Sequence, residues 1–386
     1  MRVVLLWARY WLLWAFSYLR IGAASMLYRL AVDAYRQDSR AVSERSLDRA
    51  IEVSRSGRKA DLACDLGDFQ FDLQDFEAAA VSYRRALEED DHHAPALRGT
   101  GLSLHAMGAG SEAVYYYVSL LQQDPEDVDV ILNLALVLIW SGRLEDADEL
   151  IEQAEAVVPG SADTLEVRAE MAYAKGEIDE GITILADVVE RFPERCEPRR
   201  VLGIYLHAVG RMEEAGVQFQ GALECDPDDP RLLMALTGYN KDLGNGAAVV
   251  QYARRAVDIL TERIAPADDL ATAYWHLAWG HYMLGELQDS IAAGHEGVRT
   301  APSLWGVRAD LALAQLCAGD TEAAETNYQL VVQMATDAGE LRMIAVEDLQ
   351  EAISTRPDLD HGTATRMLNL LQERERALDA ETATTR

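Results

Sequence analysis

Histidines that stand beside carboxylates in the sequence are the first places to look for catalytic or metal-binding chemistry. His92 and His93 follow two aspartates, and imidazole and carboxylate groups are ligands that divalent metals accept. The same four residues suit a solvated turn between two helices, and we favour the turn. His276 and His281 are five residues apart, so they do not share one face of a helix. Neither set predicts a metal site.

The motifs that mark common catalytic sites are missing from the sequence. It contains no HExxH, no GxxxxGK[ST] and no GxSxG, the patterns of zinc proteases, phosphate-binding loops and serine hydrolases. Its four cysteines form no CxxC pair, which argues against a zinc ribbon. We therefore predict a protein that is not an enzyme and uses no metal or cofactor.

The net charge of −30 is unevenly distributed. Residues 1–60 contain 11 Arg and Lys against 5 Asp and Glu, which sums to +6 and leaves −36 on the remainder. A phosphate backbone requires a basic protein surface. We therefore expect no nucleic-acid partner.

A period of 34 residues organises most of the chain. Rows of this length follow one another from Ala60 without a gap, at 60–93, 94–127, 128–161, 162–195 and 196–229. Column 8 holds small residues, namely Gly67, Gly101, Ala135, Ala169 and Gly203. Column 20 is also small, with Ala79, Ala113, Ala147, Gly181 and Ala215. Column 24 is bulky, with Tyr83, Tyr117, Ile151, Leu185 and Phe219. Column 15 reads Gln74, Gly108, Gly142, Gly176 and Gly210, and column 32 reads Asp91, Pro125, Pro159, Pro193 and Pro227.

Each column has a physical reason in a pair of antiparallel helices. Small residues at columns 8 and 20 allow the two helices to approach closely, and the bulky residue at column 24 fills the space between successive pairs. Glycine at column 15 ends the first helix in a left-handed cap. Proline at column 32 ends the second helix and opens the link to the next row. The rows therefore predict an all-α chain of helical hairpins.

This pattern resembles the tetratricopeptide repeat family, and the row at 196–229, with VLGIYLHAVGRMEEAGVQFQGALECDP, matches it best. The resemblance covers residues 60–338 as about eight repeats. It implies an α-solenoid, a right-handed superhelix of hairpins, that binds protein partners in the concave groove lined by the first helix of each repeat. The predicted organisation is a membrane-associating segment at 1–32, a lead-in helix at 33–59, repeats at 60–263, an insertion at 264–270, repeats at 271–338, and capping helices with a tail at 339–386.

The resemblance also implies which side chains line the groove, because columns 2, 5, 9, 12 and 13 of the first helices face it. The predicted partner-binding residues are Leu132, Leu136, Ile139, Trp140, Arg200, His207, Trp275, Trp279, Tyr282, Met283, Leu313 and Leu316. Rows one and four place acids at these columns, namely Asp61, Asp68, Asp72, Asp163, Glu166 and Glu170. Such acids select a basic peptide or simply solvate the surface, and the sequence leaves both readings open.

The stripe formed by Trp275, Trp279 and Tyr282 is the most distinctive part of this face. Aromatic residues dominate the energetics of protein interfaces. The alternative is that the stripe packs internally, against the insertion at 264–270 or the C-terminal helices. The spacing alone does not separate the two.

Residues 1–32 are aromatic, apolar and basic, with four arginines and no acid. The apolar run between Arg9 and Arg20 is shorter than the roughly 20 residues that a membrane span needs, but this composition suits a membrane interface. We expect the segment to associate with a membrane or a membrane protein; a cleaved export signal and a core helix are the alternatives. The predicted contact residues are Trp7, Arg9, Trp11, Trp14, Tyr18 and Arg20.

The location and role follow from these two features. Arginine greatly outnumbers lysine, which suggests a bacterial genome rich in G and C. Positive charge is denser after the segment than before it, which predicts that the repeats lie on the cytoplasmic face of the inner membrane. A periplasmic location is the alternative. We expect a scaffold that assembles a membrane-associated complex, or alternatively a regulatory subunit of a membrane-bound enzyme.

Overall fold

The protein is described here by a computed structural model that covers residues 23–35, 40–54, 58–262 and 266–385. Every regular element in these ranges is a helix and none is a strand, so the predicted all-α architecture of helical hairpins is confirmed. The chain divides into two compact units, Met1–Pro198 and Arg199–Arg386.

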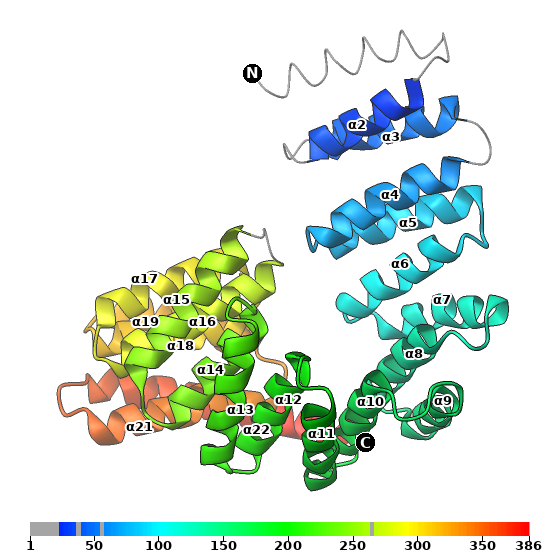
Figure 1. The fold of residues 1–386 in the computed structure, drawn as a ribbon. Helices are drawn as coiled ribbons and strands as arrows, with labels where there is room; N and C mark the ends of the chain where they lie inside the picture. The colour runs from blue at the N-terminus through cyan, green and yellow to red at the C-terminus, as the bar shows by residue number, and fades with distance from the viewer. Residues whose placement is uncertain (1–22, 36–39, 55–57, 263–265, 386) are drawn as a thin grey trace. The chain divides into compact units, whose positions relative to one another are not determined.

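In the first unit, the four rows from residue 60 to residue 195 each form one pair of helices, and Figure 1 shows the pairs following one another. Two further helices precede them. The helices are α2 (Ala23–Tyr35), α3 (Arg40–Val53), α4 (Lys59–Asp72), α5 (Phe76–Glu89), α6 (Ala94–Ala106), α7 (Gly110–Gln123), α8 (Val128–Trp140), α9 (Leu144–Val157), α10 (Ala162–Ala174) and α11 (Ile178–Arg191).

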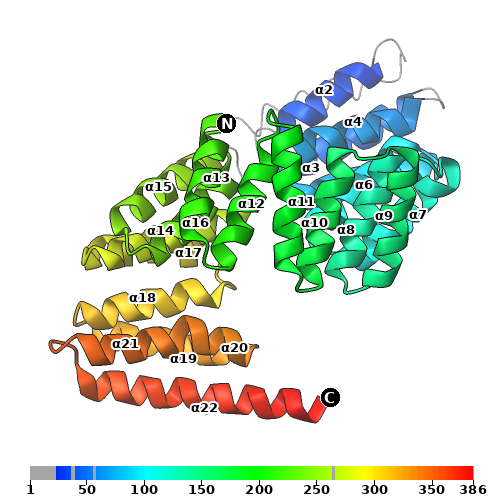
Figure 2. The ribbon, with the colours of Figure 1, turned by 60° about the horizontal axis from the view of Figure 1, so that its bottom comes forward.

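The second unit continues the same alternation and ends in helices outside the repeat pattern. Figure 2 shows α18, α21 and α22 in successive layers. The elements are α12 (Glu197–Ala208), α13 (Met212–Cys225), α14 (Pro230–Asp242), α15 (Gly246–Glu262), α16 (Ala267–Met283), α17 (Leu287–Thr300), α18 (Trp305–Cys317), α19 (Thr321–Met334), α20 (Ala338–Leu341), the π-helix η2 (Arg342–Val346), α21 (Glu347–Thr355) and α22 (His361–Thr385).

The turn inside each row from residue 60 to residue 338 has the left-handed residue that column 15 predicts. Gly142, for example, has φ of 73°, and the amide of the next residue, Arg143, donates to the Leu138 carbonyl at 2.9 Å. In the first row the position is held by Gln74, whose φ of 60° is unfavourable for a residue with a Cβ. The glycines that share the conformation at this column are Gly108, Gly142, Gly176, Gly210, Gly244, Gly285 and Gly319.

Columns 8 and 24 meet inside the hairpins. A Cβ atom added to Gly101 would lie 2.8 Å from the ring of Tyr117, which is fully buried. The ring of Tyr83 contacts Gly67 of its own hairpin and Gly99 of the next one. The bulky residue therefore joins successive hairpins, and the small residue makes room for it.

The N-terminal boundary of the repeats differs from the predicted one. Instead of one lead-in helix at 33–59, the chain forms α2 and α3, and α2 takes in residues 23–32 of the predicted membrane segment. Leu27 is fully buried with Ala50 of α3 and Leu62 of α4, and Leu30 is fully buried as well. Leu27, Leu30 and Ala31 therefore belong to the protein core, whereas Arg29 on the same helix is exposed.

The predicted insertion at 264–270 lies partly outside the described residues, which resume at Pro266. Residues 267–270 form the first turn of α16, which lengthens that helix to 17 residues. In the ranges that the structure describes, no helix combines the length and the apolar composition required to cross a membrane. The predicted membrane contacts Trp7, Arg9, Trp11, Trp14, Tyr18 and Arg20 lie outside the described residues.

A carboxyl group is buried in the core of the second unit. Asp310, on α18, is 8% exposed and accepts a hydrogen bond from Trp275 Nε1 at 2.6 Å. Burial, followed by the nearby charge of Asp348, raises the pKa of Asp310 from 3.8 to about 8. The side chain is therefore held protonated at neutral pH, because a charged carboxylate is costly in this environment.

Replacing Asp310 with asparagine is expected to stabilise the protein at alkaline pH. The folded-state pKa lies above the unfolded value, so the unfolded chain loses its proton between pH 4 and pH 8 while the folded chain retains it, and the free energy of unfolding falls as pH rises. Asp310→Asn keeps the acceptor for Trp275 and removes this loss. At pH 8 the variant should be more stable by on the order of 3 kcal/mol, and near pH 4 it should match the wild type.

Urea denaturation at both pH values measures this difference. Asp258→Asn, which changes an exposed aspartate of the same unit, serves as the control and should have little effect at either pH. An Asp310→Asn variant with a pH profile parallel to that of the wild type would contradict the assignment of a protonated side chain.

Candidate protein-binding surface

Helix α8 provides the most accessible aromatic residue of the predicted groove face. Of the four residues predicted in this row, Leu132 and Ile139 are 5% and 4% exposed, and Leu136 is partly buried. Trp140, at the end of the helix, is 62% exposed. The two buried side chains stabilise the hairpin stack and are not available to a partner, whereas Trp140 is.

Trp140 is held by residues from the neighbouring first helices. Its ring lies 4.6 Å from the ring of His105 on α6, in an edge-to-face arrangement, and its Nε1 donates to Glu170 of α10 at 3.4 Å. Burial lowers the pKa of His105, so its imidazole is neutral at pH 7. Within the described residues, His105 Nε2 is buried without a hydrogen-bond partner. Three successive repeats thus position one exposed tryptophan.

The predicted basic residues of row five pair with acids at the start and the end of the next first helix, α14. Arg200 lies 3.7 Å from Asp229, which caps the start of α14. His207 lies 2.8 Å from Asp242 and packs against the ring of Tyr239. Arg200 and His207 therefore link adjacent repeats, and a partner that used them would have to compete with these acids.

The aromatic stripe of row seven packs mostly within the protein. Trp275 lies against Gly306 and donates to Asp310, whereas Trp279 and Tyr282 pack against a cluster that includes the C-terminal helices. Lys241 lies 4.3 Å from the ring centroid of Trp279. The sequence left open whether these aromatic residues face a partner or pack within the protein. In the structure they pack against other parts of the protein.

The other predicted partner-binding residues of rows seven and eight are also buried or partly buried. Leu313 and Leu316 are 2% and 1% exposed, so they belong to the core and not to a binding surface. Met283 is partly buried and, with Leu313, lines a pocket of about 390 Å³ between α14, α16 and α21. The guanidinium of Arg356 covers the Tyr282 ring in this pocket, at 4.9 Å from its centroid. The protein's own C-terminal segment thus covers this part of the face.

A groove between α4 and α6 in the first unit lies on the predicted first-helix face, but its apolar floor was not predicted. It has a volume of about 460 Å³, and its apolar lining includes Phe71, Pro95 and Leu102, with Asp68 and Asp72 beside them. The two aspartates were predicted as acidic surface. The apolar floor was missed because alternating apolar residues in these helices also fit a buried core.

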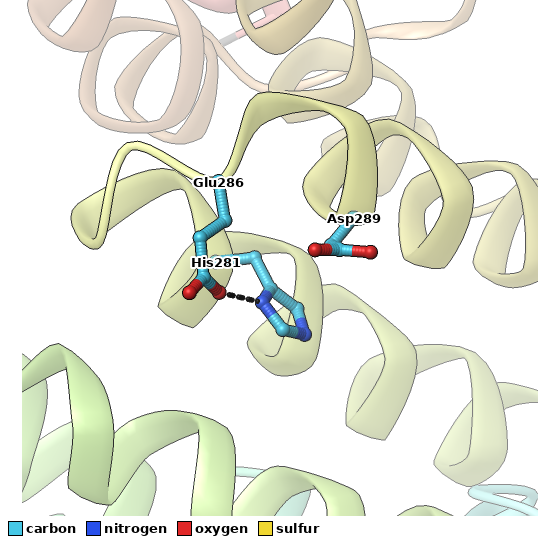
Figure 3. Close-up of side chains that lie close together, drawn as sticks. All are labelled: His281, Glu286 and Asp289. Atoms are coloured by element: carbon cyan, nitrogen blue, oxygen red, sulfur yellow. Dashed lines mark hydrogen bonds and ion pairs between the residues drawn. The ribbon is translucent and has the colours of Figure 1, made fainter.

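One set of possible metal ligands occurs among the described residues, where His281, Glu286 and Asp289 offer ligand atoms within 4.8 Å of one another (Figure 3). Both ring nitrogens of His281 are engaged: Nδ1 donates to Glu286 at 2.6 Å, and Nε2 accepts from the guanidinium of Arg254 at 3.2 Å. A metal would have to displace one of these bonds and would meet the charge of Arg254. The arrangement ties the end of α16 to the start of α17.

The other histidine pair occupies the turn between α5 and α6. His93 Nε2 lies 3.1 Å from Asp61, and its Nδ1 accepts the amide hydrogen of Ala96, so the residue caps α6. His92 is exposed. His93 serves the helix start, which agrees with the solvated turn that we favoured from the sequence.

Comparison with known proteins supports the repeat assignment. Residues 64–128 and 104–171 match the tetratricopeptide repeat family. The structure is similar to a chain of the APC/C hetero-tetramer Cut9–Hcn1, with a TM-score of 0.55, 16% identity, and coverage of 91% of this chain and 63% of that one. It is also similar to a tetratricopeptide repeat protein from Parabacteroides merdae, with a TM-score of 0.52, 16% identity, and coverage of 65% of this chain and 98% of that one.

These likenesses establish the fold, and the repeat matches establish the unit from which it is built. The chain spans less than two thirds of the Cut9–Hcn1 chain that it resembles. Residues 64–171 consist of tetratricopeptide repeats, and the chain has the helical-hairpin fold of tetratricopeptide repeat proteins.

Proposed function

We propose that this protein is a non-catalytic scaffold that binds a protein partner on the first-helix face of its repeats, with Trp140 as a central contact. The observation that supports this most strongly is the 62% exposure of Trp140 on a helix whose other large apolar side chains are mostly buried. Tryptophan is the residue type most enriched at interface hot spots. Its contacts with His105 and Glu170 hold the ring in place, which lowers the entropic cost of binding.

The proposal includes assembly at a membrane. Residues 1–22 combine Trp7, Trp11 and Trp14 with Arg2, Arg9 and Arg20, a composition that favours a membrane interface. We place the repeats on the cytoplasmic face of a bacterial inner membrane, and an exported location is the alternative. Because α2 begins at Ala23, a membrane contact within residues 1–22 does not require any described helix to unfold.

Site-specific photo-crosslinking tests the partner-binding surface. Replacing Trp140 with the photoreactive residue benzoylphenylalanine should give discrete crosslinked protein species in intact cells, because an aromatic side chain is retained at the proposed contact. The control places the same residue at Glu149, an exposed position on the second helix α9. If both positions give the same products, or neither gives any, Trp140 is not the contact. An enzyme recovered as the sole product would favour a regulatory role over a scaffold.

Carbonate extraction of membranes tests the N-terminal segment. The full chain should remain in the membrane pellet, and a variant lacking residues 1–22 should move to the supernatant while keeping its helical circular-dichroism spectrum. Equal distribution of the two proteins would contradict the membrane proposal and would leave the partner-binding proposal intact.

A further inference from the structure

The groove between α4 and α6 combines an apolar floor with a carboxylate rim. Phe71 and Leu102 are both only partly buried, so they present apolar surface to the groove. The ring of Tyr83 closes its base and donates a hydrogen bond to Asp68 at 2.8 Å. A groove of about 460 Å³ is large enough to receive side chains from another polypeptide.

The acidic rim extends along α4 beyond the groove. Asp61, Asp65, Asp68 and Asp72 are exposed and follow one another at spacings of four, three and four residues, so they share one face of the helix. The stripe is about 16 Å long at 1.5 Å rise per residue. Burial, followed by the charges of Asp68 and Asp61, raises the pKa of Asp65, which shows that the negative charges on this face act on one another.

The protein itself supplies little positive charge to this groove. Arg98 is the basic residue in its lining, and it is engaged by Asp127, the N-cap of α8. Asp65 and Asp72 form no ion pair or hydrogen bond with the residues that the structure describes. Arg58 and His93 lower the pKa of Asp65 and so offset part of the repulsion, and the exposed carboxylates of the rim remain accessible to a cation that a bound molecule supplies.

We infer that the groove between α4 and α6 binds an extended segment of a partner protein in which basic and apolar residues alternate. In an extended chain, alternate side chains point in opposite directions, so one set can pair with the carboxylates of α4 while the other rests on Phe71 and Leu102. A stripe of about 16 Å matches roughly five extended residues. The inference rests on the proposed scaffold function and adds the chemistry of one partner.

Fluorescence anisotropy with two labelled probe peptides tests the inference on the full-length protein. One peptide alternates arginine with leucine, and the other alternates arginine with serine, so that the pair differs only in its apolar side chains. The arginine–leucine peptide should bind more tightly, and Leu102→Ala should weaken it about threefold while leaving the arginine–serine peptide unchanged. This comparison separates the groove from general attraction to a protein of net charge −30.

Paired charge substitutions test the carboxylate rim. Asp68→Asn with Asp72→Asn should weaken the arginine–leucine peptide about tenfold, since asparagine keeps the acceptor for Tyr83 but loses the charge. The matched control is Glu149→Gln with Glu180→Gln, two exposed acids on the second helices α9 and α11, and it should change binding less than twofold. Equal effects of the two pairs, or equal binding of the two peptides, would overturn the inference.

The experiment also separates this inference from the proposal on which it rests. If crosslinks form at position 140 and the arginine–leucine peptide does not bind, the scaffold proposal stands and the basic partner is wrong. If sedimentation instead shows self-association that the Asp68→Asn and Asp72→Asn pair abolishes, the occupant is a second copy of this chain, and the assignment to a separate basic partner is overturned.

Discussion

The five rows from residue 60 to residue 229 depend on a match of volume between two side chains of each hairpin, those at columns 8 and 24. In rows one, two and five, glycine at column 8 faces an aromatic ring at column 24, and the ring lies where a Cβ atom would otherwise be. In rows three and four, alanine at column 8 accompanies an aliphatic residue, Ile151 or Leu185. Protein interiors pack at the density of organic crystals. A methyl group added at column 8 therefore requires a smaller side chain at column 24. This match sets how closely the first and second helices approach.

The binding surface follows from this packing. The second helices and the column 24 residues fill the core. The exposed columns of the first helices can therefore carry polar or aromatic side chains without loss of stability, and Trp140 is one of them. Trp275 and Trp279 also lie on a first helix, but Trp275 packs against Gly306 of α18, and Trp279 lines a pocket together with residues of α21. Tryptophans on first helices are thus exposed in the first unit, at Trp140, and partly buried in the second, at Trp275 and Trp279.

The sequence is sufficient to predict the features that each repeat contains within itself. Gly108 and its equivalents predict the turns, and Gly101 with Tyr117 predicts the close helix pair, because these effects act over one hairpin. Features that join distant segments were not predictable. Trp279 is partly buried by packing that involves α21, a helix with no repeat pattern. Leu27 is buried by contacts with α3 and α4. The floor of the α4–α6 groove was missed because Leu102 has the same pattern as a core residue.

A double-mutant cycle between columns 8 and 24 tests the account most directly. Gly101→Ala alone should destabilise the protein by about 1–3 kcal/mol, because the new methyl group overlaps the Tyr117 ring. In a Tyr117→Leu background the same methyl group has room, so urea denaturation should show a double variant at least 1 kcal/mol more stable than the sum of the single effects. Additive effects would contradict the claim that matched volumes hold the hairpins together.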